Sequence, residues 1–566
     1  MRQEKWVVVA KRADFERIGQ RFGIDPVVAR LIRNRDIEGD EEIERYLYGT
    51  LSQLHDPHGL CDMEEAVGIL GKKIAQHKKI RVIGDYDVDG IMSSYILLKG
   101  LMLLGADADV VIPHRIQDGY GLNDHLIEKA HQDGVDTILT CDNGIAAYGQ
   151  VDLANRLGLT VVVTDHHEVP YEDDADGRTY ILPPAAAVVD PKQPDCSYPF
   201  KGICGAVVAL KLMQTLMGET PEDFLEMAAF ATVCDVMELV DENRILVRYG
   251  LKAMEHSHNI GLAALIEVCG LQGKPLSAYH IGFVLGPCMN ATGRLDTAKR
   301  ALKLLLSETH AEAVTIAAEL KNLNESRKEM TASGVEQAVR LIEEKGLADR
   351  KVLIVYLPEC HESLAGIIAG RIREKYGRPV FVLTDSEDGI KGSGRSIEAY
   401  SMYEELSKCR DLFTRYGGHK MAAGVSLPAE NLKEFEDRME EECCLTPEDY
   451  VEKVRIDALM PFSYVNEELV KQLSLLEPFG NGNRKPLFAQ KDLKLDSVRV
   501  MGKDHNVGKY RVTDEYGGHY ELTFFGDQGE LQQTWEQNGT LSVTYYPQIN
   551  VYRGRSEIQF VIQNFQ

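Results

Sequence analysis

The sequence lacks any apolar run long enough to cross a membrane, and its first residues, MRQEKWVVVAKRADFERIG, carry only a short apolar patch between charges. Such a start is neither a secretory signal nor a transit peptide, so a soluble protein of the cytoplasm is expected. The 11 cysteines include no C-x-x-C pair, and adjacent Cys443 and Cys444 have no companion pair that would complete a zinc finger. The sequence therefore predicts reduced thiols, without disulfides or a structural zinc ion.

An excess of positive charge is also absent, since 63 Lys and Arg stand against 88 Asp and Glu, for a net charge of -25. This balance argues against general adhesion to nucleic acid or anionic lipid, although a local basic groove is compatible with it. There are no internal repeats or low-complexity tracts. A chain of 566 residues is too long for one core, and its length predicts roughly three to four domains.

Hydrophobic patterns predict a multidomain α/β protein. Runs such as KIRVIG, ADVVIP, DTILT, LTVVVT and AAAVVD alternate with helical patterns, as in an α/β domain with a mainly parallel sheet. Residues 301–346 contain almost no helix breaker, and one continuous helix there would span ~70 Å, long enough to join two lobes. The expected divisions are a lead-in at 1–60, an α/β domain at 61–260, a helical connector at 261–346, a second α/β domain at 347–447 and a β-rich barrel or sandwich at 448–566.

Acidic and histidine clusters follow three strands of the predicted sheet. Asp85, Asp87 and Asp89 come directly after KIRVIG, and such close like charges repel unless they lie in water or a strongly positive group sits between them. Asp142 follows DTILT, and the segment TDHH at 164–167 follows LTVVV. Because ligands gather at the carboxyl ends of parallel strands, we expect these side chains to share one crevice.

Each cluster alone has a simpler structural explanation: DYDVDG as a solvated turn, CDNG as a type I′ turn, and adjacent histidines as fillers of a polar core position. Together they match the oxygen-rich ligand sets of Mn²⁺ or Mg²⁺ better than a zinc site, which would favour thiolates. Asp235 ends the apolar segment FATVC, where a lone charge would be costly to bury. Two divalent ions about 3.5–4 Å apart suit in-line attack on phosphorus, so the hypothesis is phosphoester hydrolysis.

Two glycine-rich loops are candidates for binding phosphate. KGSGRS at 391–396 carries Ser393 and Arg395, and GGHKMAAG at 417–424 carries His419. Small residues let backbone N–H groups approach an anion, and arginine can hold phosphate through a bidentate fork. From spacing alone, two tight turns with a structural arginine explain these loops equally well.

The motifs DYDVDG, CDNG, TDHH and CDVMEL, in this order, resemble the first four motifs of the DHH phosphoesterases. Further matches at PHRIQDGYGLN, GPCMNATGR, GSGRS, RYGGHKMAAG and LEPFGNGNRKPLFA extend the resemblance to the single-strand-specific 5′ exonucleases of that family, over nearly all of residues 45–566. The resemblance implies a DHH catalytic domain, a DHH-associated substrate-binding domain and a C-terminal OB-like barrel. It also implies release of mononucleotides from the 5′ end of single-stranded DNA, in recombination and repair.

The resemblance also implies roles for individual residues. Two Mn²⁺ or Mg²⁺ ions would be held by Asp87, Asp89, Asp142, His166 and Asp235, with Asp142 bridging them. Asp85 would be either a further ligand or a group just outside the ligand set. His167 would contact the scissile phosphate and assist the leaving oxygen, and Asp165 would orient an imidazole. With Asp142 they would form the catalytic group. The substrate contacts would be Arg115, Arg294, His361, Ser393, Arg395 and His419.

The β-rich C-terminal segment mixes tyrosines and phenylalanines with basic residues, which is compatible with an OB-fold that stacks bases and tracks a nucleic-acid backbone. Aromatic residues also fill the cores of small barrels, so the roles of Tyr510, Tyr545 and Tyr552 stay open. In the resembled family such a barrel closes a channel that admits one strand and excludes a duplex.

The chain departs from the family pattern at Cys288 and Met289, where arginine and isoleucine are common, at Cys360, where tryptophan is common, and at Arg484, where proline is frequent. None of these departures removes a predicted metal ligand, but they concern the substrate contacts.

One alternative function is hydrolysis of pyrophosphate, cyclic dinucleotides or very short oligonucleotides, and another is a non-catalytic replication scaffold. The C-terminal domain and the long helical connector favour a polymer, and the full set of carboxylates favours an enzyme. We expect a monomer, which a helicase or a single-strand-binding protein could assist.

Overall fold

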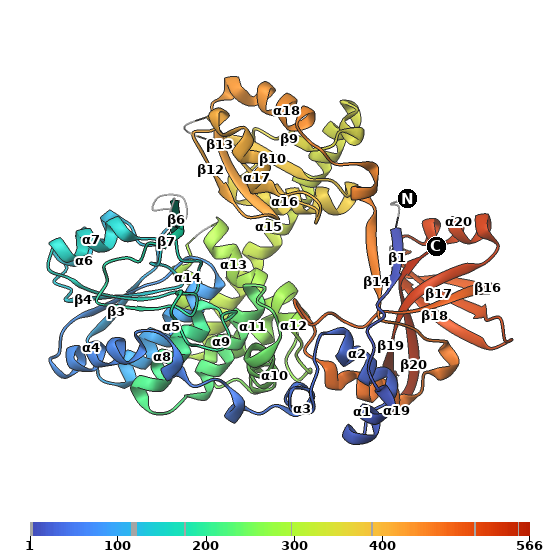
Figure 1. Ribbon diagram of the computed structural model, residues 1–566, viewed down its shortest axis with the longest axis horizontal. Coiled ribbons are helices and arrows are strands. Elements are labelled where there is room, and N and C mark those ends of the chain that lie inside the picture. Colours follow the sequence, from blue (N-terminus) through green and yellow to red (C-terminus); the bar gives the residue numbers. More distant parts are fainter. Residues whose placement is uncertain are drawn as a thin grey trace.

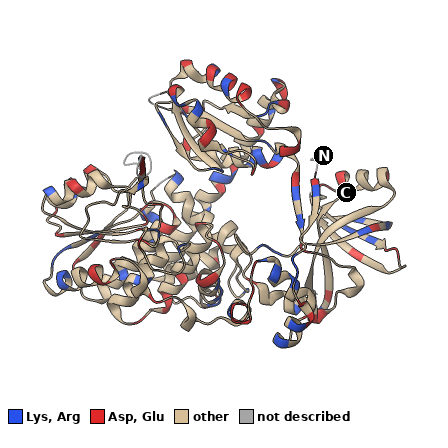
Figure 2. Ribbon diagram, in the orientation of Figure 1, with Lys and Arg blue, Asp and Glu red and all other residues tan. Residues whose placement is uncertain are grey.

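The computed structural model describes residues 4–114, 121–174, 177–295, 297–386, 389–502, 505–552 and 554–566. Three lobes lie at the corners of a triangle (Figure 1): a first α/β lobe with its helical connector, a second α/β lobe and a β-barrel. Figure 2 shows acidic and basic residues interspersed over all three lobes, so the negative net charge is not confined to one of them. Within the described ranges, no helix combines the length and apolarity needed to cross a lipid bilayer.

The first lobe is built on a five-stranded parallel sheet, as the alternating pattern predicts. Its order is β3-β2-β4-β5-β8, and every neighbouring pair is parallel. All four residues of β2 and all five of β4 are buried, because helices cover both faces of the sheet. The strands are β2 (Ile80–Ile83), β3 (Ala108–Val111), β4 (Thr137–Cys141), β5 (Thr160–Thr164) and β8 (Ala187–Val189). All five are runs that the sequence predicts as strands.

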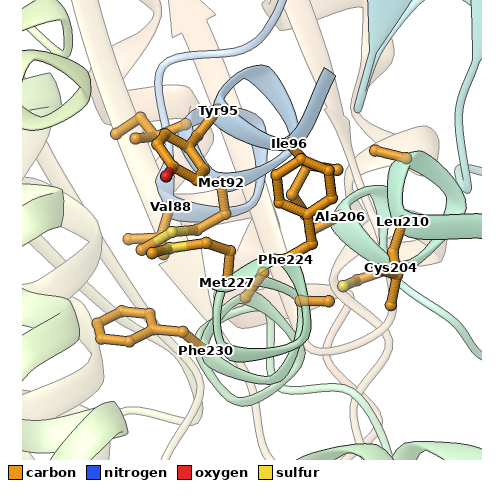
Figure 3. Packing of buried hydrophobic residues seen from close by; sticks show 14 of the residues in the cluster. Val88, Met92, Tyr95, Ile96, Cys204, Ala206, Leu210, Phe224, Met227 and Phe230 are labelled. Carbon is orange, nitrogen blue, oxygen red and sulfur yellow. The ribbon is translucent and has the colours of Figure 1, made fainter. Parts of the chain in front are cut away.

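Helices surround this sheet, and one of them is central to the core. The helix α5 is apolar on nearly all sides because it lies between the sheet and helices α8 and α9. Figure 3 shows its residues Val88, Met92 and Ile96 in the same cluster as Phe224 and Met227 of α9. The helices are α4 (Met63–Ala75), α5 (Val88–Leu103), α6 (Asp124–Gln132), α7 (Tyr148–Arg156), α8 (Gly205–Met217), α9 (Glu222–Cys234) and α10 (Asp241–Met254), and a hairpin is formed by β6 (Tyr171–Asp174) and β7 (Gly177–Tyr180).

The connector differs in detail from one continuous helix over 301–346. A break separates α14 from α15, because the side chain of Thr309 accepts a hydrogen bond from the backbone N–H of Glu312 and starts a new helix. The 35 residues of α15 span ~52 Å and contact α11 and α13 in the first lobe and α16 in the second, so the predicted joining role is confirmed. The elements are α11 (Ile260–Val268), α12 (Ala278–His280), the π-helical turn η3 (Ile281–Leu285), α13 (Gly286–Leu295), α14 (Lys299–Leu305), α15 (His310–Glu344) and α16 (Glu362–Tyr376).

The second lobe contains a mixed five-stranded sheet of order β12-β13-β11-β10-β9. Only β9 and β10 are parallel, and the other neighbours are antiparallel. Its elements are β9 (Leu353–Tyr356), β10 (Val380–Ser386), β11 (Gly389–Arg395), β12 (Arg415–Gly418), β13 (Ala422–Leu427), α17 (Met402–Lys408) and α18 (Leu432–Glu441).

The third lobe is a closed barrel. Its strands run in the order β15-β16-β17-β18-β20-β19, and pairing of β19 with β16 closes the sheet on itself. Tyr510 and Tyr545 are fully buried in its core, while the side chain of Tyr552 lies outside the described part. The elements are β15 (Ala458–Leu459), α19 (Glu467–Leu473), β16 (Phe488–Met501), β17 (Val507–Thr513), β18 (His519–Phe525), α20 (Gln528–Asn538), β19 (Leu541–Tyr552) and β20 (Arg555–Phe565).

The N-terminal segment packs against this barrel, although the two are far apart in the sequence. Val28, Leu31 and Ile32 share a hydrophobic core with Leu473 and Tyr545. Strand β1 pairs in parallel with β14, the strand that enters the third lobe. The elements are β1 (Glu4–Val8), α1 (Phe15–Phe22), α2 (Pro26–Asn34), α3 (Asp40–Tyr48) and β14 (Glu452–Ile456).

Candidate metal centre and adjoining cavity

The predicted metal ligands lie together at the carboxyl edge of the parallel sheet. Three groups of side chains each place their ligand atoms within 4.8 Å of one another; the groups are Asp85 with Asp87 and Asp142, Asp89 with His166 and Asp235, and Asp142 with His166 and His167. Asp142 belongs to two of these groups. A shared carboxylate between two clusters is the arrangement that two adjacent divalent ions require.

His166 is the nitrogen donor at the centre of this arrangement. Its Nε2 lies 3.1 Å from Asp142 Oδ1, 3.5 Å from Asp89 Oδ2 and 3.8 Å from Asp235 Oδ2. The imidazole is buried, and burial lowers its pKa although the carboxylates oppose this. A neutral imidazole facing three carboxylates is a donor set that fits Mn²⁺ or Mg²⁺.

The carboxylates are electrostatically strained without a cation. Burial, followed by repulsion from Asp89 and Asp87, raises the pKa of Asp235 to about 8. The same causes, burial first, raise the pKa of Asp142 well above its ordinary value. A bound divalent ion would relieve this repulsion, so the residues present fit the predicted metal.

Local backbone structure fixes the acids in place. Asp87 caps α5 by accepting a hydrogen bond from Gly90 N–H at 3.0 Å. Both oxygens of Asp89 accept hydrogen bonds from the first backbone N–H groups of α8, at 2.7 and 2.8 Å. Gly205 begins α8 there, and a Cβ at that position would come within 2.9 Å of the Asp142 Cβ. A glycine is therefore required for the close approach of α8 to the cluster.

Asp165 holds the two histidines rather than facing the cluster. Its Oδ1 lies 2.7 Å from His167 Nδ1 and also accepts the His166 N–H, while its Oδ2 accepts the Ile145 N–H at 2.9 Å. Burial alone would raise the pKa of Asp165, but the contact with His167 holds it below its ordinary value. Burial likewise opposes protonation of His167, yet the hydrogen bond to Asp165 and the nearby carboxylates raise its pKa to about 9.

Arg294 connects the metal cluster to the second lobe. A cavity of about 300 Å³ is lined by the cluster and by α13, with Asp85, Asp87, Asp89, Asp235, Asn290 and Arg294 in its wall. Arg294 Nη1 donates to the backbone oxygen of Ser363 at 2.7 Å, near the start of α16. His361 caps the same helix, where its Nδ1 accepts the Ser363 N–H. Two predicted substrate contacts, Arg294 and His361, thus lie at the boundary between the lobes.

A second cavity, of about 450 Å³, adjoins this boundary. Tyr86 lines it from the first lobe, and Ser363, Lys391, Ser393, Arg415 and Tyr416 line it from the second. Lys391 Nζ lies 3.2 Å from Glu362 Oε2. Glu362 lines the same cavity and offsets part of the charge of Lys391. With Arg415 and the hydroxyl-bearing, glycine-rich strand, the lining still carries one more cation than carboxylate, which suits an anion.

The other predicted substrate contacts are placed differently. Arg395 lies against α16: a Cβ at Gly366 would come within 2.8 Å of its Nη2, and its Nη1 donates to the Gly394 oxygen at 2.8 Å. Neither Arg395 nor His419 is among the described residues that line the two cavities. Arg115 lies outside the described residues.

Sequence reasoning missed Lys391 and Arg415 as cavity residues, although both stand at the edge of recognised motifs, KGSGRS and RYGGHK. Their convergence comes from strand pairing, since β11 and β12 flank β13, with Lys391 and Arg415 both opposite Ser426. The sequence signal that could have found them is a basic residue near the start of each glycine-rich strand. Spacing alone could not show that the two strands share a neighbour.

Three of the departures from the family pattern, Cys288, Cys360 and Arg484, have contacts outside the metal-ligand groups. Cys288 is buried, and its Sγ is 3.6 Å from Asn324 Nδ2 of α15. Cys360 precedes α16, and its carbonyl accepts a hydrogen bond from Thr384. Arg484 lines a different cavity, between the second lobe and β14. None of the three lines the two cavities described above, within the part of the chain that the structure covers.

Metal affinity is expected to rise with pH. The raised pKa values of Asp235 and Asp142 mean that the metal-free site holds protons near neutrality, which an entering cation must displace. Raised carboxyl pKa values also mean that ionisation destabilises the metal-free fold as pH rises toward 8. Mn²⁺ should therefore bind more tightly, and raise Tm more, at about pH 8.5 than at about pH 6.5. Calorimetric titration and thermal melts at both values measure this, and equal affinity at both would contradict it.

Comparison with known proteins gives matches over the three lobes. Residues 79–233 match the DHH family N-terminal domain, 349–443 the DHHA1 domain and 456–564 the RecJ OB domain. The single-stranded-DNA-specific exonuclease RecJ of Bacillus subtilis (strain 168) is 34% identical over 96% of this chain and 68% of that protein. The protein of the same name from Escherichia coli (strain K12) is 33% identical, over 96% of both chains. The crystal structure of RecJ in complex with Mn²⁺ from Thermus thermophilus superposes with a TM-score of 0.84 and 29% identity, over all of this chain and 80% of that one.

Proposed function

Because the chain belongs to the RecJ family of DHH phosphoesterases, we propose that it is a single-stranded-DNA-specific exonuclease that releases mononucleotides from the 5′ end, in DNA recombination and repair. The observation that carries this proposal is the pair of ligand clusters that share Asp142. Beside them, at the boundary of the two α/β lobes, lies a cavity whose wall contains Lys391, Arg415 and Glu362. Together they offer a cleavage site and a separate place for the terminal phosphate.

One Mn²⁺ or Mg²⁺ ion would be held by Asp89, His166 and Asp235, and a second by Asp85 and Asp87. Asp142 groups with Asp85 and Asp87 and its Oδ1 lies 3.1 Å from His166 Nε2, so it would serve both ions. Such ions lower the pKa of a bound water and neutralise phosphate oxygens. The chain's own contribution is to fix the acids through the starts of α5 and α8 before any ion enters.

His167 is the residue that we assign to the leaving oxygen. Its Nδ1 lies 2.7 Å from Asp165 Oδ1, and this carboxylate raises the pKa of the ring, so it favours a protonated imidazole with Nε2–H as a second donor. Transfer of that proton to the departing 3′ oxygen of the terminal nucleotide would complete cleavage. Asp165 keeps the ring oriented and stabilises its charged form, as the partner of a general acid should.

The second cavity supports the 5′ polarity. A terminal phosphate carries more negative charge than an internal one, and Lys391, Arg415 and the hydroxyl of Ser393 are suited to recognise it. Arg294 lines the cavity of the metal cluster and contacts Ser363, which lines the second cavity, and His361 caps the helix that begins there, so the terminal nucleotide would pass beside them. Arg395 and His419 would act from outside the cavity wall, on the strand or on its loops.

Digestion of labelled DNA tests the proposal. Single strands blocked at either end, a circular single strand and a blunt duplex are incubated with Mn²⁺, Mg²⁺ or EDTA. We expect mononucleotides from the 3′-blocked strand, with either metal and not with EDTA, and little product from the other substrates. Equal degradation of the 5′-blocked strand, or cutting of the circle, would overturn the polarity. A preference for di- and trinucleotides over long strands would favour the short-oligonucleotide hydrolase.

A further inference from the structure

A fourth strand also ends at the metal-binding edge of the sheet. Strand β8 pairs in parallel with β5, with Val189 opposite Thr164, and Asp165 donates its N–H to the Val189 oxygen at 3.0 Å. The segment that follows β8 therefore emerges beside the two histidines. In this segment Asp190 is fully buried and its Oδ1 accepts the Lys192 N–H at 2.7 Å. That hydrogen bond fixes the turn and sets where the Lys192 side chain starts.

The Lys192 side chain runs toward the histidine side of the cluster. Its Nζ lies 3.1 Å from Oε1 of Glu168, the residue directly after His167. Lys192 is only 23% exposed, whereas Glu168 is 76% exposed.

This position is not explained by stability alone. An ion pair with a largely exposed carboxylate contributes little to folding and exchanges easily. The cation nevertheless lies beside the residue that follows His167, at the sheet edge that carries the cluster. Lysine is a compact charge that suits a phosphate oxygen. Arg294 lines the cluster's cavity from α13, so Lys192 would be a second cation, contributed by a different element of the sheet edge.

We propose that Lys192 is a further substrate-contact residue: its ammonium binds a backbone phosphate of the single strand at the metal centre, and Glu168 holds the ammonium ready until that phosphate displaces it. The inference rests on the proposed exonuclease function and adds a contact to it. Asp190 acts as a positioning residue, because its buried carboxylate fixes the turn that carries Lys192. Glu168 competes with the substrate for the same cation.

Substitutions at both ends of the ion pair test this assignment. Lys192→Met removes the charge and keeps the length, Lys192→Arg keeps the charge, and Glu168→Gln releases the cation. The control is Lys433→Met, which removes a lysine that pairs with Asp437 at 2.7 Å on α18. For each protein, kcat/KM on a 5′-phosphorylated oligothymidylate is measured with Mn²⁺ between about 50 and about 200 mM KCl.

Lys192→Met is expected to lower kcat/KM about tenfold at low salt, the effect of losing one charge-assisted contact. It should also reduce the slope of log(kcat/KM) against log[salt] by about 0.7, the value for one phosphate contact on a single strand. Lys192→Arg should keep the wild-type slope, and Glu168→Gln should raise kcat/KM about twofold at low salt. A merely structural role would change Tm and leave the salt slope unaltered.

Two outcomes would overturn the assignment: a wild-type salt slope in Lys192→Met, or a loss in Lys192→Arg as large as in Lys192→Met. Equilibrium binding of the same oligonucleotide with Ca²⁺ in place of Mn²⁺ gives a readout that does not need turnover. If wild-type protein degrades the strand and Lys192→Met behaves like Lys433→Met, only this inference fails. If wild-type protein binds the strand without degrading it, the proposed function fails, and the salt slope of binding still decides the role of Lys192.

Discussion

Asp142→Asn is expected to lower kcat by about a thousandfold, because breaking a buried charge arrangement costs on the order of 3–5 kcal/mol. A carboxylate shared by two clusters serves both proposed ions, and a neutral amide would leave their charge undercompensated. Asparagine is a better replacement than alanine for isolating the effect of the charge, because Asp142 has a φ of 59° and asparagine tolerates this left-handed conformation. The loss should therefore report the missing charge rather than backbone strain.

The control for this variant is Asp492→Asn. Asp492 has a φ of 55° and is exposed in the barrel, so it tests the same chemical change in the same backbone conformation away from the site. Single-turnover cleavage and calorimetric titration with Mn²⁺ are measured for both variants. Asp492→Asn should match wild type in both. Cleavage by Asp142→Asn within about threefold of wild type would refute the assignment of Asp142 as the bridging ligand.

The double variant Lys391→Ala/Arg415→Ala is expected to lose about a hundredfold in kcat/KM on 5′-phosphorylated single strands, because two charge-assisted contacts are removed. On strands with a 5′ hydroxyl the loss should be small, since the terminal phosphate that these cations recognise is missing. Metal affinity should stay unchanged, because neither residue belongs to the ligand clusters. The preference for a 5′ phosphate would thus disappear while cleavage continues.

Initial rates on strands that differ only in the 5′ group measure this effect. Arg410→Ala/Lys433→Ala is the matched control, since both residues are exposed in the second lobe and line neither cavity among the described residues. If the double variant lost activity equally on both substrates, the cavity would serve the strand in general rather than its end. A parallel fall in Mn²⁺ affinity would mean that the two lobes had separated.

The order of the lobes and the convergence of the acidic and histidine clusters could be predicted from the sequence, because both depend on local patterns. Buried parallel strands appear as apolar runs, and the residues that follow them must lie at one edge of the sheet. That rule alone grouped Asp85, Asp142 and His166, which the structure places in overlapping clusters. The break between α14 and α15 was harder to predict, because the capping residue Thr309 lies within a pattern that is otherwise helical.

Only the tertiary structure decided which cations line the second cavity. Lys391 and Arg415 meet because β13 lies between their strands, whereas Arg395, four residues after Lys391, lies against α16. Lys192 lies 3.1 Å from Glu168 because β8 neighbours β5. Leu31 joins the barrel core although more than four hundred residues separate it from Leu473. Such contacts depend on which elements pack together, and local periodicity carries no information about that choice.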